Sequence, residues 1–142
     1  LFDFAGKKQN AAIRLCGKLE AEIAALPADE KSPFLEEYNL PEPGLDKLIH
    51  ASYKLLNLET FFTGGDKQVR AWTISKDATA SQPAREIHTD MERGFIKAEV
   101  FKYDDLVRLG SEKAVKNAGL ATLHGKDYVV QDGDCIYFHF NV

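Results

Sequence analysis

Residues 69–90, VRAWTISKDATASQPAREIHTD, decide the fold that this chain is expected to adopt. Residues 69–74 alternate and are β-branched or aromatic at most positions, which is typical of a strand with one buried face. Residues 75–77 offer the side chains of a turn. From Thr79 onward, hydroxyl side chains can cap a helix. The inward positions of that helix are expected to be Ala80, Ala84, Ile87 and Met91.

The sequence beyond this helix predicts the remaining strands of a sheet. Four more strands are expected, at residues 95–103, 120–123, 128–130 and 135–140. Short helices are expected to begin at Asp104 or Asp105 and at Ser111, whose side chains can cap them. Alternation along the first of these strands places one set of residues on a common face: Phe95, Lys97, Glu99, Phe101 and Tyr103. This order fits an α+β fold in which a mixed sheet is covered by one main helix.

The N-terminal part predicts a different organisation. Residues 11–16 are expected to form a short strand that ends at Gly17, and residues 18–26 a helix. A strand, a glycine turn and a helix make half of a βαβ unit, and the other half is not visible in this sequence. Four of the five prolines fall within residues 27–43, which predicts a linker with a short acidic helical piece at residues 33–38.

A stronger helix is expected at residues 45–58, and the chain then passes through Phe61 and Phe62 to a glycine-rich end at residues 63–65. The apolar face of this helix contains Leu45, Leu48, Ile49, Ser52, Tyr53 and Leu56. We therefore expect three segments. They are the end of an α/β domain with its linker at 1–44, a connecting helix and turn at 45–68, and a complete small domain at 69–142.

The composition excludes several classes of protein. With 142 residues, 28% charged residues and a net charge of −4, the chain is expected to be a soluble globular protein, and no segment is basic enough to predict nucleic-acid binding by charge alone. No apolar run is long enough to cross a membrane. Cys16 and Cys135 lie far apart and predict free thiols in a reducing cytoplasm. The chain begins with Leu1 and without a signal peptide, which suggests a fragment or a processed product.

The candidate catalytic and metal-binding residues have simpler explanations. His88 and Asp90 are not accompanied by a recognisable Ser or Cys nucleophile, so we expect them to end a helix through hydrogen bonds. The other histidines, His50, His124 and His139, share no ligand spacing. The aspartates at 127, 132 and 134 surround a glycine but lack the offsets of a calcium loop, which predicts a turn. We expect no catalytic residue and no metal site in this chain, and a core position for Cys135.

Several motifs resemble those of known proteins. The segments at 72–74, 87–90 and 132–134 (WTI, IHTD and DGD) resemble a TGS domain, a small β-grasp, ubiquitin-like module. Longer stretches resemble the C-terminal part of the YchF/Obg-like ATPase family: FFTGGDKQVRAWTI, IHTDMERGFIKAEVFKYDDLV, GKDYVVQDGD and the final FNV. Residues 13–22 resemble the last strand and helix of that family's nucleotide-binding domain, which explains the incomplete βαβ unit.

The resemblance implies where nucleotide chemistry resides. Family members bind ATP or GTP with Mg²⁺ through a glycine-rich phosphate loop, and no G-x-x-x-x-G-K-[ST] pattern occurs in this sequence. No cofactor is therefore expected in this chain. Only Cys16, Gly17 and Lys18 match a nucleotide-site position, where the family's backbone approaches the base. This sequence also departs from the family at residues 81–85, SQPAR, where Arg85 replaces a glycine and puts a docking surface there in doubt.

The resemblance also implies partners: the ribosome or ribosomal RNA, translation factors, and the family's own N-terminal nucleotide-binding domain, coupled through the helix at 45–58. The cations that could contact RNA phosphates are Arg70, Arg85, Arg93, Lys97 and Lys102, near Trp72, Phe95 and Tyr103. Acidic residues interleave with them, so a solvated face of mixed charge is an equally good interpretation. The competing class of protein is a free-standing ubiquitin-like interaction module unrelated to nucleotide hydrolysis.

Overall fold

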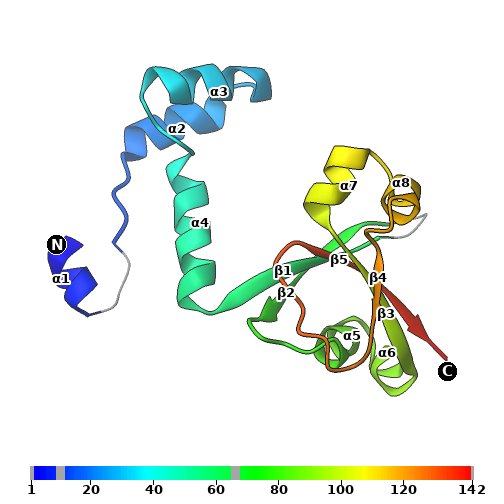
Figure 1. Cartoon of the computed structure of the whole chain (residues 1–142). Coiled ribbons are helices and arrows are strands. Elements are labelled where there is room, and N and C mark those ends of the chain that lie inside the picture. The colour runs from blue at the N-terminus through cyan, green and yellow to red at the C-terminus, as the bar shows by residue number, and fades with distance from the viewer. Residues whose placement is uncertain (1, 9–11, 65–67, 142) are drawn as a thin grey trace. The chain divides into compact units, whose positions relative to one another are not determined.

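The structure is a computed structural model that describes residues 2–8, 12–64 and 68–141. These residues form two compact units, one within Leu1–Leu56 and the other within Asn57–Val142 (Figure 1). The first unit is helical and the second contains a five-stranded sheet. The mixed α+β class expected from the sequence is confirmed.

The first unit contains four helices. They are α1 (Phe2–Lys7), α2 (Gly17–Ala25), α3 (Ala28–Glu37) and α4 (Gly44–Leu55). The expected strand at 11–16 is wrong over residues 12–16, which have no regular structure, and residue 11 lies outside the described residues. A strand needs a hydrogen-bonded neighbour, and in the described part of the chain the segment has none. Gly17 begins α2 instead of ending a strand.

The start of α4 is tied to α2 by one carboxylate. The Gly44 N–H donates to the two Glu20 side-chain oxygens at 2.9 and 3.0 Å, which satisfies a donor that the helix itself leaves unpaired. A Cβ at position 44 would meet the ends of the Leu15 and Glu20 side chains, so a larger residue there would displace this carboxylate. The helix ends at Leu55, three residues before the predicted end, and Leu45, Leu48 and Ile49 of its apolar face remain exposed.

The second unit is built on a mixed sheet with the strand order β2-β1-β5-β3-β4. Its strands are β1 (Leu58–Thr63), β2 (Arg70–Ser75), β3 (Phe95–Lys102), β4 (Thr122–His124) and β5 (Asp134–Phe140). β1 runs parallel to β5, and the other neighbouring pairs are antiparallel. Four of these strands were predicted. β1 was not, because its residues were assigned to the end of the preceding helix.

Helices cover both faces of the sheet, where the sequence predicted one main helix. On one side lie α5 (Ser81–Ile87) and α6 (Thr89–Arg93), and on the other α7 (Tyr103–Leu109) and α8 (Glu112–Asn117) (Figure 1). The predicted helix from Thr79 is divided at His88, whose extended backbone (φ −165°) separates α5 from α6. Residues 128–130 do not form the predicted strand. They form only a single β-bridge, between Thr79 and Val129.

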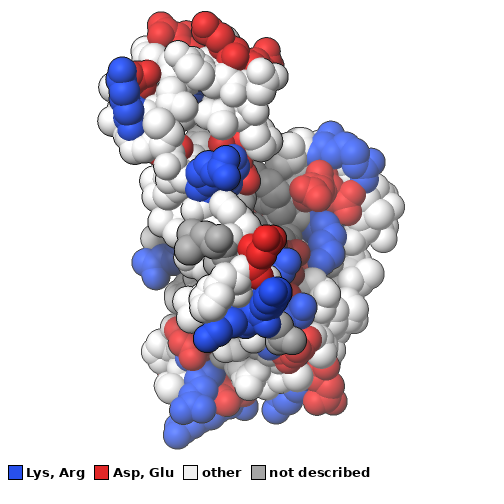
Figure 2. All heavy atoms as spheres, turned by 90° about the vertical axis from the view of Figure 1, so that its left-hand side faces the viewer, with Lys and Arg blue, Asp and Glu red and all other residues white. Residues whose placement is uncertain are grey.

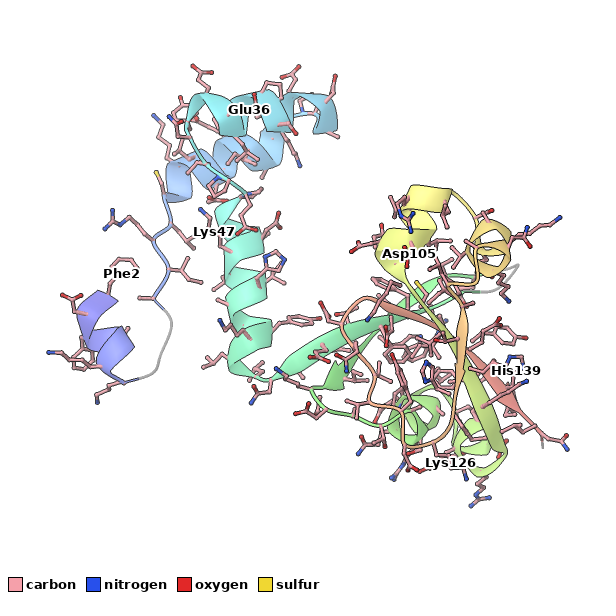
Figure 3. All side chains as sticks on the ribbon, in the orientation of Figure 1. Phe2, Glu36, Lys47, Asp105, Lys126 and His139 are labelled. Carbon is pink, nitrogen blue, oxygen red and sulfur yellow. The ribbon has the colours of Figure 1, made fainter. Side chains whose placement is uncertain are left out.

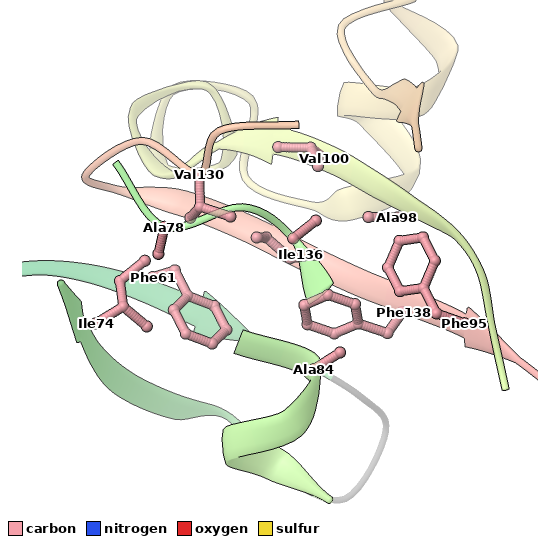
Figure 4. Packing of buried hydrophobic residues seen from close by; sticks show 11 residues of the cluster. Phe61, Ile74, Ala78, Ala84, Phe95, Ala98, Val100, Val130, Ile136 and Phe138 are labelled. Carbon is pink, nitrogen blue, oxygen red and sulfur yellow. The ribbon is translucent and has the colours of Figure 1, made fainter. Parts of the chain in front are cut away.

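The main core lies between the sheet and the helices α5 and α6. Phe61 of β1 is fully buried at its centre and lies edge-on to Phe138 at 6.3 Å (Figure 4). The ring of Trp72 stacks 6.4 Å from Phe61. Of the predicted inward residues, Ala80 and Ala84 belong to this cluster, and the partly buried Ile87 and Met91 pack against it. Burial of these apolar surfaces supplies most of the stabilising free energy of the unit.

A smaller core lies on the opposite side of the sheet. Phe101 of β3 and Cys135 of β5 pack there with Val115 of α8 and with residues of α7. The predicted common face of β3 is therefore only partly correct. A register shift between Phe95 and Lys97 turns Phe95 towards the main core, whereas Phe101 faces the smaller one.

Candidate docking surface

The helices α7 and α8 cover only one end of their side of the sheet. Their contacts with the strands centre on Phe62, Phe101 and Cys135. Alternation along the paired strands brings the next residues of β3, β4 and β5 to the same side without a covering helix. We call this area the open sheet face and define it by Lys97, Glu99, Leu123, Tyr137 and His139.

Two large side chains project from the open sheet face. Tyr137, on the central strand β5, is 53% exposed, and Leu123, on the edge strand β4, is 58% exposed. His139 lies two residues along β5 (Figure 3), with its ring edge-on to Tyr137 at 5.0 Å. An exposed aromatic side chain on a central strand leaves apolar area in water that a binding partner could cover.

The charges of the open sheet face are nearly balanced. Lys116 of α8 forms an ion pair with Glu99 at 2.9 Å, and His139 Nε2 lies 3.8 Å from the same carboxylate. Lys97 is half-buried and, among the described residues, takes part in no ion pair. Basic and acidic side chains are also interspersed over the side of the molecule seen in Figure 2.

A cavity of about 90 Å³ opens where the open sheet face meets α7 and α8. Apolar residues of the sheet and of α7 line it, including Phe62, Phe101, Leu106 and Cys135. Polar groups of Glu112 and Lys116, together with the ring of Tyr137, also line it. The cavity can hold one apolar side chain. Among the described residues that line it, no nucleophile lies beside a general base.

The thiol of Cys135, which lines this cavity, has low nucleophilic reactivity at neutral pH. Burial, then the nearby charges of Asp134 and Glu112, raise the pKa of Cys135 to about 11. The thiol is therefore protonated at neutral pH and behaves as a small apolar group. The predicted core position is confirmed, and both cysteines are free, Cys16 being exposed.

The five cations predicted to contact RNA are not brought together. Lys97 alone lies on the open sheet face. Arg70 lies on the edge strand β2, with its guanidinium 5.8 Å from the Trp72 ring centre, and Arg85 pairs weakly with Glu92 at 3.8 Å. The others are Arg93, exposed on α6, and Lys102, which forms an ion pair with Asp134 at 2.7 Å.

The aromatic neighbours predicted for these cations are mostly unavailable. Phe95 is buried and Trp72 is half-buried against the main core, whereas Tyr103 is exposed beside the cavity. Tyr137 and His139 were missed as candidates, although the alternation of residues 135–140 placed them with Cys135 on one side of the last strand. What the sequence did not reveal is that α7 and α8 are too short to cover that side.

The residues that match a nucleotide-site position lie at the start of α2. Cys16 precedes the first turn of this helix, followed by Gly17 and Lys18, and all three are exposed. The Cys16 side chain makes no capping hydrogen bond. A role for them in nucleotide contact stays a prediction.

The remaining candidates have structural roles. His88 follows the end of α5, as the helix-ending interpretation predicted, and its Nδ1 caps the start of α6 by accepting a hydrogen bond from the Asp90 N–H at 3.2 Å. Within residues 2–8, 12–64 and 68–141, no group of three or more His, Cys, Asp or Glu side chains is placed to hold a metal ion. Across the same residues, no helix is long and apolar enough to cross a membrane.

The predicted turn at 131–134 organises the sheet around a buried acid. Asp134 is fully buried, and its Oδ2 accepts hydrogen bonds from the Tyr128 hydroxyl and the Gln131 N–H, both at 2.8 Å. Its Oδ1 forms the ion pair with Lys102, without the angle of a directed hydrogen bond. Burial, followed by the bond to Asp134 and its charge, raises the pKa of Tyr128 well above its ordinary value. The cluster therefore holds a protonated phenol on a carboxylate.

Comparison with known proteins identifies the family. Residues 58–141 match the YchF-GTPase_C family, described as a protein of unknown function (DUF933). The chain belongs to the YchF family. The matched residues begin at Leu58, the first residue of β1, and include every strand of the sheet in the second unit. The resemblance stated from the sequence motifs is confirmed.

The chain resembles part of longer relatives. It is 51% identical over 140 residues to "Ribosome-binding ATPase YchF" of Pasteurella multocida, covering 99% of this chain and 39% of that protein. It is 50% identical over 129 residues to "Obg-like ATPase 1" of Gallus gallus, covering 91% of this chain and 32% of that protein. The chain thus spans about two-fifths or less of the length of these relatives.

A solved structure shows the same arrangement. The Schizosaccharomyces pombe YchF GTPase superimposes with a TM-score of 0.77 at 33% sequence identity, covering 92% of this chain and 34% of that one. The mixed α+β fold of this chain is therefore similar to the corresponding part of that solved structure.

Proposed function

We propose that this chain is the C-terminal, partner-binding part of a ribosome-associated YchF-type ATPase, and that its sheet unit is a TGS domain of the β-grasp class. The family match over residues 58–141 supports the first part. A mixed sheet with short helices packed on it and parallel β1 and β5 supports the second. Relatives at 51% identity carry the name ribosome-binding ATPase, which supports the ribosome as the partner.

The main support for this proposal is the exposed apolar area of the open sheet face. Its two large exposed side chains, Tyr137 and Leu123, belong to neither core cluster. Aromatic residues at the centre of an exposed patch contribute strongly to binding, and a polar rim gives the contact its orientation. The open sheet face is therefore suited to binding a partner. No cluster of described side chains has the arrangement of a catalytic site.

Nucleotide hydrolysis then belongs to the N-terminal domain of the full-length family member, with ATP or GTP and Mg²⁺ bound there. Cys16, Gly17 and Lys18 contribute at most a backbone turn near the base. The helix α4 couples that domain to the sheet unit through the exposed apolar residues Leu45, Leu48 and Ile49. In this division of roles the chain recognises its partner and does not itself turn over nucleotide.

Cosedimentation of the 142-residue chain with intact ribosomes tests the proposal. We expect the chain to pellet with ribosomes at low salt and to remain partly bound at physiological salt, because a contact centred on Tyr137 does not depend on phosphate charges. A free-standing interaction module unrelated to translation would stay in the supernatant at every salt concentration, and that result would refute the proposed function.

A further inference from the structure

The cavity and the open sheet face form one continuous strip along β3 and β5. Phe101 and Cys135 are paired across the strands at the cavity, Glu99 and Tyr137 form the next pair, and Lys97 and His139 the one after. Each step of two residues advances about 6.6 Å along a strand. The apolar cavity and the lysine at the far end are therefore separated by about 13 Å along the strip.

We propose that this strip binds an extended segment of a protein, which places one branched aliphatic side chain in the cavity and a carboxylate four residues away beside Lys97. The inference rests on the proposed function and deepens it. A ribosome offers both protein and RNA surfaces, and the inference is that this strip binds protein. Residues i and i+4 of an extended segment lie on the same face about 13 Å apart, which matches the spacing of the strip.

The size and lining of the cavity define the anchor. An engineered apolar cavity of about 150 Å³ accepts benzene, so a cavity of about 90 Å³ is suited to a smaller group such as the isobutyl side chain of leucine. Phe62, Phe101 and Leu106 offer only apolar contacts to it. Most of the lining is apolar, so a nucleobase, which carries polar atoms on several edges, would find hydrogen-bond partners for few of them.

The charges of the strip argue against RNA as the occupant. Lys116 is paired with Glu99, and Glu112 lies at the same cavity, so the strip presents no excess of cations to a phosphate backbone. Lys97 forms no ion pair among the described residues and lies next to His139 across the strands. One carboxylate on the partner would complete the pairing at that end of the strip.

Three synthetic peptides test the inference directly. Acetyl-Leu-Thr-Ala-Thr-Asp-amide carries the anchor and the acid, one control replaces its leucine by serine, and the other replaces its aspartate by lysine. We expect the first peptide to shift the backbone amide NMR signals of Phe101, Cys135 and Tyr137 at millimolar concentration. The serine peptide should bind at least about tenfold more weakly, since it leaves the cavity unfilled. The lysine peptide should bind about fivefold more weakly at low salt.

Variants of the chain sharpen the test. Lys97→Glu should reverse the preference between the aspartate and lysine peptides, and Tyr137→Ala should weaken both, while Tyr38→Ala in the helical unit is the matched control. Both Tyr137 and Tyr38 are exposed, so neither truncation is expected to unfold the chain, and NMR dispersion verifies this. Equal binding of the leucine and serine peptides, or an unchanged preference in Lys97→Glu, would overturn the inference.

Ribosome binding separates failure of this inference from failure of the proposed function. If ribosomes do not retain the chain but the peptides bind as expected, only the proposed function is wrong. If ribosomes retain Tyr137→Ala less well than Tyr38→Ala but the peptides do not bind, the open sheet face docks on the ribosome and only the inference is wrong. Retention by protein-free ribosomal RNA that Tyr137→Ala abolishes would show that the strip recognises RNA, which also overturns the inference.

Discussion

Replacing Asp134 with alanine is expected to lower the free energy of unfolding by about 2–4 kcal/mol, because the change removes a fully buried carboxylate and leaves two hydrogen-bond donors without their acceptor. The ammonium group of Lys102 loses its partner, and the Tyr128 hydroxyl and the Gln131 N–H each lose a hydrogen bond. Unpaired polar groups in a buried site retain their full desolvation penalty. Urea denaturation followed by the fluorescence of Trp72, the single tryptophan, measures the effect.

Two further variants show whether the loss comes from the cluster. Asp127→Ala removes an exposed aspartate near the same turn and should change stability by less than about 0.5 kcal/mol. Lys102→Met introduced together with Asp134→Ala should recover little of the loss, because the half-exposed ammonium group of Lys102 can return to water when its partner is removed. If Asp134→Ala alone cost less than about 1 kcal/mol, the cluster would not hold the strands together as the contacts indicate.

Replacing Phe61 with alanine is expected to cost about 3–5 kcal/mol. The ring is fully buried between Trp72 and Phe138, so truncation leaves a cavity that the facing strands cannot fill. The matched control is Phe140→Ala at the end of β5, where the ring is 39% exposed and the loss should be clearly smaller. The same denaturation experiment compares the two variants.

This variant also tests where the sheet unit begins. If residues 58–63 belonged to a connecting segment, as their sequence suggested, Phe61→Ala would behave like a surface substitution and cost less than about 1 kcal/mol. A large loss places β1 inside the cooperative core. The boundary at Asn57, rather than at residue 69, is the one that the compact units and the family match both favour.

The missed strand β1 shows a limit of periodicity. The sequence LETFFT places two aromatic residues side by side, and a short apolar run does not distinguish a strand from a buried helical turn. A local signal was available at Asn57, whose φ of 52° is the left-handed conformation that asparagine tolerates after a helix. Strands β2, β3 and β5 were predictable because their patterns alternate over at least six residues.

The features of the candidate site depend on contacts that no local pattern contains. A turn at Asp134 was predictable from its neighbours, but its complete burial was not, because Lys102 reaches it from another strand. Likewise, alternation placed Tyr137 beside Cys135 on one side of the last strand. Which of the two would be covered depends on the lengths and positions of α7 and α8, and these are set by tertiary packing.

A photo-crosslink from position 137 tests the central claim most directly. The chain carrying p-benzoylphenylalanine in place of Tyr137 is mixed with ribosomes and irradiated, beside a chain carrying the same group in place of Tyr38. If the open sheet face is the docking surface, position 137 will crosslink to a ribosomal protein well above the level at position 38. If the chain cosediments with ribosomes and position 137 crosslinks no more than position 38, the open sheet face is not the surface that binds.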